Sequence, residues 1–103
     1  MRKRFVVVIE RSTESQNNAL LDWIKAEGLG WWHWFQNAWL LSNNKGHLDC
    51  ERIRDKLMEI YGSANNLVIE MGGSGDSWAA YGPSNEKKSM FTWLRDTWSK
   101  IDE

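Results

Sequence analysis

Glu10 and His33 are of types that do acid–base or metal chemistry; the first ends an apolar run and the second stands within an aromatic run. Glu10 follows the apolar run Phe5–Ile9, and a carboxylate at that position could hold a magnesium ion. Pairing with the adjacent Arg11 is the simpler interpretation. His33 could transfer protons near neutral pH, but no Asp, Glu, Ser or Cys stands beside it. We therefore expect a structural histidine.

The remaining chemical candidates are weaker. His47 has no acidic ligand nearby in sequence, so the two histidines do not predict a zinc site. Cys50 stands where a helix is expected to begin, which favours a thiolate, yet no base accompanies it. The glycine-rich stretch 72–75 lacks the Gly-Lys-Ser/Thr of a phosphate loop. The sequence therefore predicts no metal site, no cofactor and no complete catalytic set.

Aromatic residues are the most unusual feature, because the chain contains 8 tryptophans among its 103 residues. An aromatic strand surface can stack nucleic-acid bases, but such surfaces are usually ringed by Lys and Arg, and residues 29–44 contain neither. A core or protein-interface role is favoured, since aromatic residues dominate interface cores. The residues expected to form an interface or to stack a ligand are Trp31, Trp32, Trp34, Phe35, Trp39 and Trp78.

The charge balance argues against a general nucleic-acid binder, because the formal net charge is -1. The clustered cations have two interpretations: a local phosphate-contacting patch, or a solvated strand edge and helix face. The candidate members of this patch are Arg2, Lys3, Arg4, Arg52, Arg54 and Lys56.

Hydrophobic patterning predicts four strands and two helices in the first two thirds of the chain. Strand formers occupy 5–9, 31–36 and 38–42, and the last two are either a tight hairpin or two strands sharing a bend. If side chains alternate strictly along 31–36, Trp32, Trp34 and Gln36 share one face while Trp31, His33 and Phe35 share the other. The first helix is expected over 13–27, the second from the cap Asp49 to Gly62, and the fourth strand at 67–71.

Beyond the fourth strand, residues 72–85 are expected to be a flexible connector and 86–100 a final helix. Phe91, Leu94 and Trp98 fall on one side of that helix, with Met90 and Trp93 alongside.

The element order β-α-β-β-α-β predicts one α+β domain over 1–103, with a ferredoxin-like sandwich at 1–71 and a C-terminal helical extension. Two helices would cover one sheet face and leave the other open. Since the strands carry apolar residues on both sides, we expect the open face to be covered by the C-terminal segment, by a partner, or by both.

One cysteine and the absence of an apolar run of membrane-spanning length favour a cytoplasmic protein with a reduced thiol and no membrane partner.

The chain resembles the small SinR-like family, which is related in fold to the CRISPR-associated protein 2 family. The matching pieces are the apolar first strand, Trp32-His33, Trp39–Leu41, Glu51–Leu57, Leu67–Glu70, Trp78 and Trp93-Leu94. The resemblance implies a ferredoxin-like domain that is often dimeric. In nuclease-type relatives the first strand ends in Tyr-Asp, whose Asp binds metal at a dimer axis, whereas this strand ends in Ile9-Glu10-Arg11.

These observations favour a non-catalytic interaction domain that forms a homodimer or docks another protein through an aromatic sheet surface. The alternative is a nucleic-acid-binding protein or degenerate metal-dependent nuclease of the CRISPR-associated protein 2 type, in which Glu10 replaces the metal-binding Asp.

Overall fold

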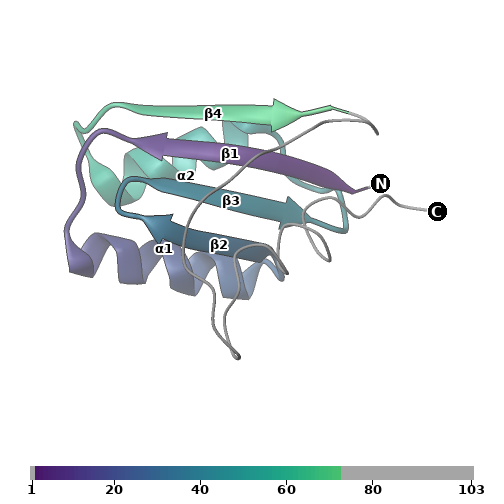
Figure 1. The fold of residues 1–103 in the computed structure, drawn as a ribbon, viewed down its shortest axis with the longest axis horizontal. Coiled ribbons are helices and arrows are strands. Elements are labelled where there is room, and N and C mark those ends of the chain that lie inside the picture. Colours follow the sequence, from purple (N-terminus) through teal and green to yellow (C-terminus); the bar gives the residue numbers. More distant parts are fainter. Residues whose placement is uncertain (1, 73–103) are drawn as a thin grey trace.

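A computed structural model of the chain describes residues 2–72, apart from the side chain of Trp34. Each predicted strand and helix within that range is present, with bounds within about two residues of those expected. The elements are β1 (Lys3–Ile9), α1 (Glu14–Ala26), β2 (Gly30–Phe35), β3 (Ala38–Asn43), α2 (Cys50–Tyr61) and β4 (Asn66–Met71) (Figure 1). The predicted C-terminal helix (86–100), Trp78 and all but the first residue of the predicted connector lie outside the described residues.

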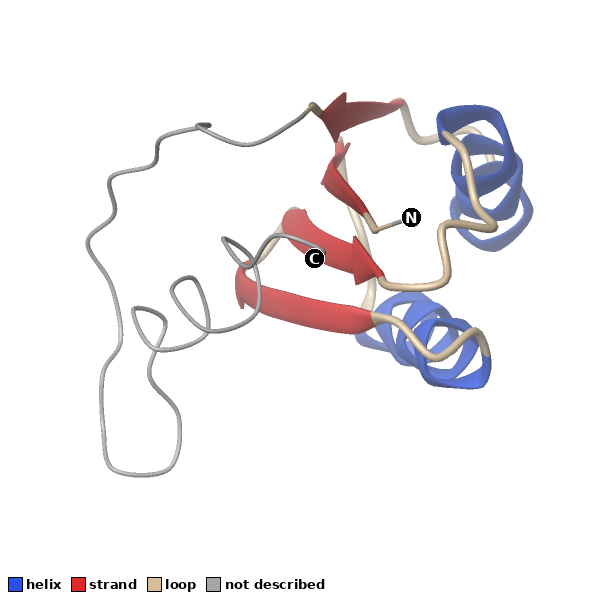
Figure 2. Cartoon of the chain, turned by 90° about the vertical axis from the view of Figure 1, so that its right-hand side faces the viewer, coloured by secondary structure: helices blue, strands red, loops and turns tan. Residues whose placement is uncertain are grey.

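The four strands form one antiparallel sheet in the order β2-β3-β1-β4. Both helices lie on the same side of it, as the edge-on view in Figure 2 shows. This arrangement confirms the predicted α+β, ferredoxin-like topology. Residues 31–43 form a hairpin rather than two strands joined by a shared bend, because β2 and β3 pair directly on either side of a short turn.

Each helix begins at a side chain that satisfies its first backbone amides. Thr13 caps α1 in a capping box: its hydroxyl accepts from the Gln16 amide at 3.1 Å, and the Thr13 amide donates to the Gln16 side chain at 2.9 Å. Asp49 caps α2 by accepting from the Arg52 amide at 2.8 Å. The local sequence therefore determines where both helices start.

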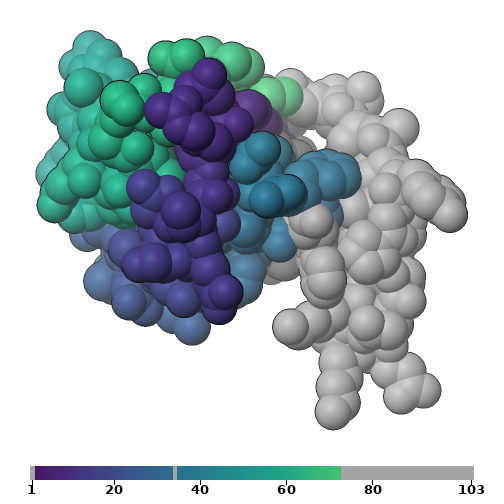
Figure 3. Space-filling view, turned by 90° about the vertical axis from the view of Figure 1, so that its left-hand side faces the viewer, coloured from purple at the N-terminus to yellow at the C-terminus, as the bar shows by residue number. Residues whose placement is uncertain are grey.

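The end of α2 is determined by Gly62, which has a φ of 64° and donates its amide to the Met58 carbonyl. A residue with a Cβ disfavours that φ, so glycine makes the reversal into β4 inexpensive. At the same end of the sheet, β1 bonds to both neighbouring connections: Ile9 N donates to Asn37 O and Glu10 N donates to Asn65 O, each at 2.8 Å. Figure 3 looks onto this end, where purple, blue and green segments meet.

The core lies between the sheet and the two helices. One face of β1 and β3 packs against α1 and α2, and the hydroxyl of Tyr61 on α2 donates to Asn17 Oδ1 on α1 at 2.8 Å. The largest fully buried apolar side chains in this layer are Phe5, Val7, Ile9, Leu20, Ile24, Trp39, Leu41, Ile53 and Leu57.

Candidate functional site

The sheet face opposite the helices carries mostly apolar side chains, with Arg4 and Ser42 at one end, and we call it the open face. Strand register places its members: Val6 pairs with Leu40 and Ile69, and Val8 pairs with Ala38 and Leu67. Paired residues in an antiparallel sheet project to the same side. The apolar members of the open face are Val6, Val8, Trp32, Phe35, Ala38, Leu40, Leu67, Ile69 and Met71.

Several of these side chains are unusually exposed for their size. Leu67 is 55% exposed, Ile69 45% and Val8 41%, and the three lie on neighbouring strands β4 and β1. Phe35 is 55% exposed at the far edge of the sheet. Scattered exposed apolar residues are ordinary, whereas these three lie on adjoining strands and form one apolar patch.

An irregularity in β2 determines which aromatic side chains reach the open face. The β2–β3 register shifts between Trp32 and Phe35, so Trp32 opposes Leu40 while Phe35 opposes Ala38. Trp32 and Phe35 consequently share the open face and meet edge to face with ring centroids 5.0 Å apart. Strict alternation would place Phe35 on the other side of the sheet with Trp31 and is therefore wrong. A bulge adds a residue to the strand, so the residues after it project to the opposite side of the sheet.

Trp32 is 4% exposed, and its indole Nε1 is buried without an acceptor among the described residues. A buried donor without a partner costs about 1–3 kcal/mol.

The remaining described aromatic residues of the hairpin lie on the helix-covered face. The His33 ring stacks on Trp39 at a centroid distance of 3.6 Å and an interplanar angle of 5°, and Trp31 packs obliquely on Trp39 at 6.1 Å. Desolvation by burial lowers the pKa of His33 below 6.5, opposed by its hydrogen bond to the Gln36 carbonyl at 3.1 Å. The structure thus divides the predicted aromatic set between two faces. Trp34's side chain and Trp78 lie outside the described residues.

Glu10, the carboxylate considered for metal binding, makes local contacts. Its Oε1 accepts from Arg11 at 2.7 Å and from the Asn65 backbone amide at 3.0 Å. These bonds tie the end of β1 to the start of β4. Within residues 2–72, no three His, Cys, Asp or Glu side chains gather as a metal site would require.

A histidine network that local sequence did not predict lies between α1 and the β3–α2 connection. His47 Nε2 lies 2.8 Å from Glu27 Oε1, and His47 Nδ1 lies 3.1 Å from the Asn43 amide nitrogen. Asn43 Oδ1 accepts from the Leu48 backbone amide at 2.9 Å, so the side-chain nitrogen of Asn43 is the atom that faces His47. That nitrogen can only donate, so His47 Nδ1 accepts and the imidazole hydrogen is on Nε2. No nucleophile of residues 2–72 is hydrogen-bonded to this ring, and Cys50 packs against the core. The network positions a loop.

The six basic residues considered as a patch are distributed over different parts of the surface. Arg2 donates to Ser42 Oγ at 3.2 Å at the open face, whereas Lys3 and Arg52 donate to backbone carbonyls of the β3–α2 connection. Arg54 pairs with Asp55 and Lys56 pairs with Glu59 on α2, while Arg4 is buried in β1.

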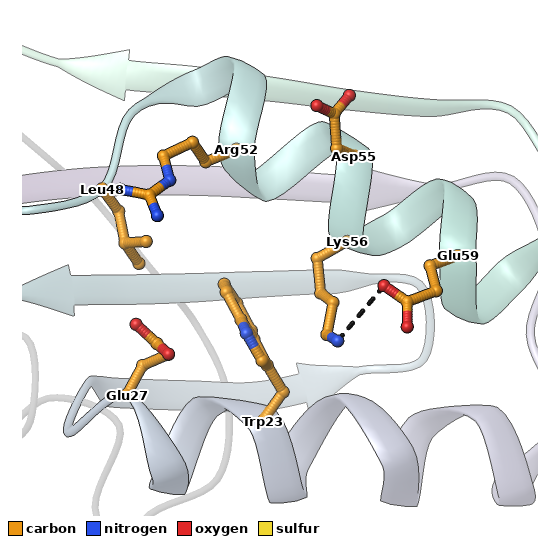
Figure 4. A pocket seen from close by; sticks show the side chains of 7 residues that line it. All are labelled: Trp23, Glu27, Leu48, Arg52, Asp55, Lys56 and Glu59. Carbon is orange, nitrogen blue, oxygen red and sulfur yellow. Dashed lines mark hydrogen bonds and ion pairs between the residues drawn. The ribbon is translucent and has the colours of Figure 1, made fainter.

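A shallow groove of about 270 Å³ separates α1 from α2 on the outer surface of the helices (Figure 4). Its lining carries three acidic and two basic side chains, and the Lys56–Glu59 pair lies within it. The mixed charges favour no particular ligand. The lining residues are Trp23, Glu27, Leu48, Arg52, Asp55, Lys56 and Glu59.

The chain matches no protein-family model, no curated protein and no solved structure. Among the described residues, no helix is long and apolar enough to cross a membrane. The fold and the open face therefore carry the functional argument.

Proposed function

We propose that this protein is a non-catalytic interaction domain that docks protein through the open face of its sheet, forming a homodimer or binding another protein. The observation that carries the proposal is the run of exposed Val8, Leu67 and Ile69 across two adjoining strands. Burying such a face against a partner lowers the free energy by roughly 25 cal/mol for each Å² of apolar surface removed from water.

A second copy is a chemically suitable occupant. Two identical apolar faces can pack in an isologous contact, in which every residue of the interface is used twice. The aromatic pair Trp32–Phe35 lies on the same face and supplies the residue types that enrich interface cores. A reduced thiol at Cys50 suits the cytoplasm, which we propose as its compartment.

The test uses two substitutions on adjacent residues of β4. Ile69 projects from the open face, whereas Glu70 pairs with Phe5 on the opposite side, and both are exposed. Light scattering on a size-exclusion column over a range of loading concentrations measures the mass, which is 12.1 kDa for one chain. We expect the wild-type chain to approach twice that mass with rising concentration. Ile69→Lys should weaken association by at least about 30-fold, since each dimer buries the lysine twice.

Glu70→Lys is the matched control and should associate as the wild type does. Equal masses for wild type and Ile69→Lys at every concentration, with no partner protein lost from Ile69→Lys, would contradict the proposal.

A second candidate, which we propose as the alternative, is nucleic-acid binding related to the CRISPR-associated protein 2 family, with or without residual cleavage. Arg2 donates to Ser42 on the open face, which also carries the exposed ring of Phe35, so a cation and an aromatic ring share that face. Single-stranded RNA should then bind with an affinity that falls steeply with salt. Salt-independent binding, together with no magnesium-dependent cleavage, would remove this candidate.

A further inference from the structure

Among residues 2–72, β2 and β4 are the two edge strands of the sheet, and they differ in regularity. β2 carries the register shift between Trp32 and Phe35. β4 pairs with β1 over six consecutive residues without a shift, and its sequence contains no Lys, Arg or Pro. Bulges, prolines and lysines are the usual means by which an edge strand is kept from pairing with another chain. The edge formed by β4 is therefore the one suited to pairing.

The hydrogen bonds at the end of β1 show which backbone groups of β4 point away from the sheet. Asn65 O accepts from Glu10 N at 2.8 Å, so the backbone of residue 65 points toward β1. In an antiparallel strand, the N–H and C=O of one residue point to the same side, and that side alternates along the strand. The N–H and C=O groups of Asn66, Val68 and Glu70 therefore point outward, where the described sheet has no further strand.

We propose that β4 pairs antiparallel with β4 of a second copy, across a two-fold axis at Val68, so that two sheets become one. Backbone groups of a sheet edge are the ordinary means of such strand addition. The inference goes beyond the proposed function and does not depend on it, because the pairing uses the edge of the sheet and not the open face. Both open faces then lie on the same side of the joined sheet.

The outward groups determine the register. Centring the pairing on Val68 places Asn66 opposite the partner's Glu70, so every outward residue of β4 meets another outward residue and exchanges two hydrogen bonds with it. Centring it on Leu67 or Ile69 leaves one outward residue unmatched within β4. Centring it on Glu70 places two carboxylates opposite each other, which is destabilising.

The side chains that meet in this register are complementary. On the helix-covered face, the amide of Asn66 can donate to the carboxylate of the partner's Glu70. On the open face, Leu67 lies opposite the partner's Ile69, and these side chains are 55% and 45% exposed in the single chain. Symmetry repeats each contact. This self-complementarity favours a second copy over an unrelated peptide as the occupant of the edge.

α2 presents a further exposed apolar side chain beside the same edge. In Figure 1, α2 lies behind β4 and β1, whereas α1 lies toward β2. Lys56 lines the groove that faces α1, and Met58 is about 160° around the helix from it, on the flank toward β4. Met58 is 55% exposed. A two-fold axis at the β4 edge turns these flanks of the two α2 helices toward each other, so the joined sheet also brings the Met58 side chains together.

Mass alone does not separate edge pairing from a contact between open faces, so the first experiment measures amide hydrogen exchange by NMR in dilute and in concentrated solution. The amides of Leu67 and Ile69 already bond to β1 in a single chain. The amides of Asn66, Val68 and Glu70 should exchange at least about tenfold more slowly in the concentrated sample, because pairing withdraws them from water. Exchange at these three amides that is independent of concentration would overturn the inference.

A charge exchange across the axis tests the register. Asn66→Asp places a carboxylate opposite the partner's Glu70 twice in each dimer, and should weaken association at least about fivefold in light scattering on a size-exclusion column. Adding Glu70→Lys makes both pairs attractive and should restore association at least to the wild-type level. Glu70→Lys alone should stay close to the wild type, since the Asn66 amide oxygen can accept from a lysine. No effect of Asn66→Asp, or a double variant as weak as Asn66→Asp, would overturn the inference.

A proline at the centre of the edge tests the backbone contribution. Val68→Pro removes an outward N–H and leaves the bonds to β1, which is the position where an edge strand tolerates proline. It should abolish edge pairing, whereas the matched control Val68→Thr retains the N–H and should associate as the wild type does. Circular dichroism verifies that both variants fold. A folded Val68→Pro variant that associates like Val68→Thr would overturn the inference.

Val8→Lys separates edge pairing from the proposed function, because Val8 lies on the open face of β1, one strand in from the edge. If Val8→Lys abolishes association while the outward amides of the wild type show no dependence on concentration, the open face docks protein and edge pairing is overturned. If those amides are protected in the concentrated wild type and Val8→Lys associates normally, the dimer forms at the edge.

Discussion

The two faces of the sheet carry similar apolar residues, but the exposure of these residues differs along β1. Along β1, Phe5, Val7 and Ile9 are 0–1% exposed against the helices, while Val8, between two of them, is 41% exposed on the open face. Both sets are apolar and β-branched or aromatic. The difference arises because α1 and α2 both lie on one side of the sheet (Figure 2).

This contrast shows that an apolar strand pattern does not reveal by itself which side of the strand is covered. A half-buried antiparallel strand normally alternates apolar and polar residues. β1 has the pattern of a fully buried strand, and yet among the described residues it has a second layer on one side only. Substitutions on the two faces should therefore differ in energy. Two comparisons test that difference and two further predictions test the helix-covered side, from the largest expected effect to the smallest.

The sharpest comparison uses neighbouring residues of β1. Phe5→Ala should lower the free energy of unfolding by about 3–5 kcal/mol, because it opens a cavity beneath both helices. Val6→Ala, on the open face, should cost about 1 kcal/mol or less, because water reaches that side chain. Urea unfolding followed by circular dichroism measures both values. Equal losses would mean that the open face is as well packed as the helix-covered face.

A second comparison uses polar neighbours on β3. Asn43→Leu should lower the free energy of unfolding by about 2 kcal/mol, because it leaves the buried Leu48 amide without its acceptor. Ser42→Ala should cost about 1 kcal/mol or less, since Arg2 and Asn44, its partners, can be rehydrated. The same urea titration measures both. A larger loss for Ser42→Ala would place the more important polar contact at the open face.

A third prediction concerns the contact between the two helices. Burial raises the pKa of Tyr61 from 10.0 to about 12. Because the folded chain holds this proton more tightly than the unfolded chain, the contribution to stability is complete below pH 10 and is lost as the pH rises through 12. Tyr61→Phe should cost about 1 kcal/mol at neutral pH through the lost bond to Asn17, and should lack this part of the alkaline decline. Urea midpoints measured above pH 10 test it; parallel declines in both proteins would refute it.

The smallest expected effect is at His33. Its pKa lies below 6.5 because burial against Trp39 disfavours the charged ring. Its contribution to stability is therefore complete above pH 6.5 and decreases as the pH falls through the folded-state pKa. A proton NMR titration of the imidazole measures this pKa directly. A value above 6.5 would show that the ring is hydrated and that this part of the helix-covered face is open to water.

Over residues 2–72, local sequence was sufficient to predict the element order and the helix limits. Thr13 and Asp49 cap their helices because a hydroxyl or carboxylate can reach an amide two or three residues ahead, which requires no tertiary structure. Gly62 likewise ends α2 through its own backbone freedom.

The side of the sheet to which each aromatic side chain projects could not be predicted from local sequence. Trp32 and Phe35 share a face only because β2 shifts its register against β3, and a run that is aromatic on every residue contains no alternation to reveal such a shift. The contact of Glu27 with His47 was also missed, because the two residues are 20 positions apart in the sequence. An asparagine at a helix-facing position of β3, Asn43, was the one sequence signal that could have suggested a buried polar network there.

The sequence by itself therefore determined the strands, the helices and their caps, because these depend on backbone preferences and contacts between residues a few positions apart. Tertiary structure decided which apolar residues are core and which form the open face. The assignment depends on which side of the sheet both helices pack against. A strand that is apolar on both sides is compatible with helices on either side.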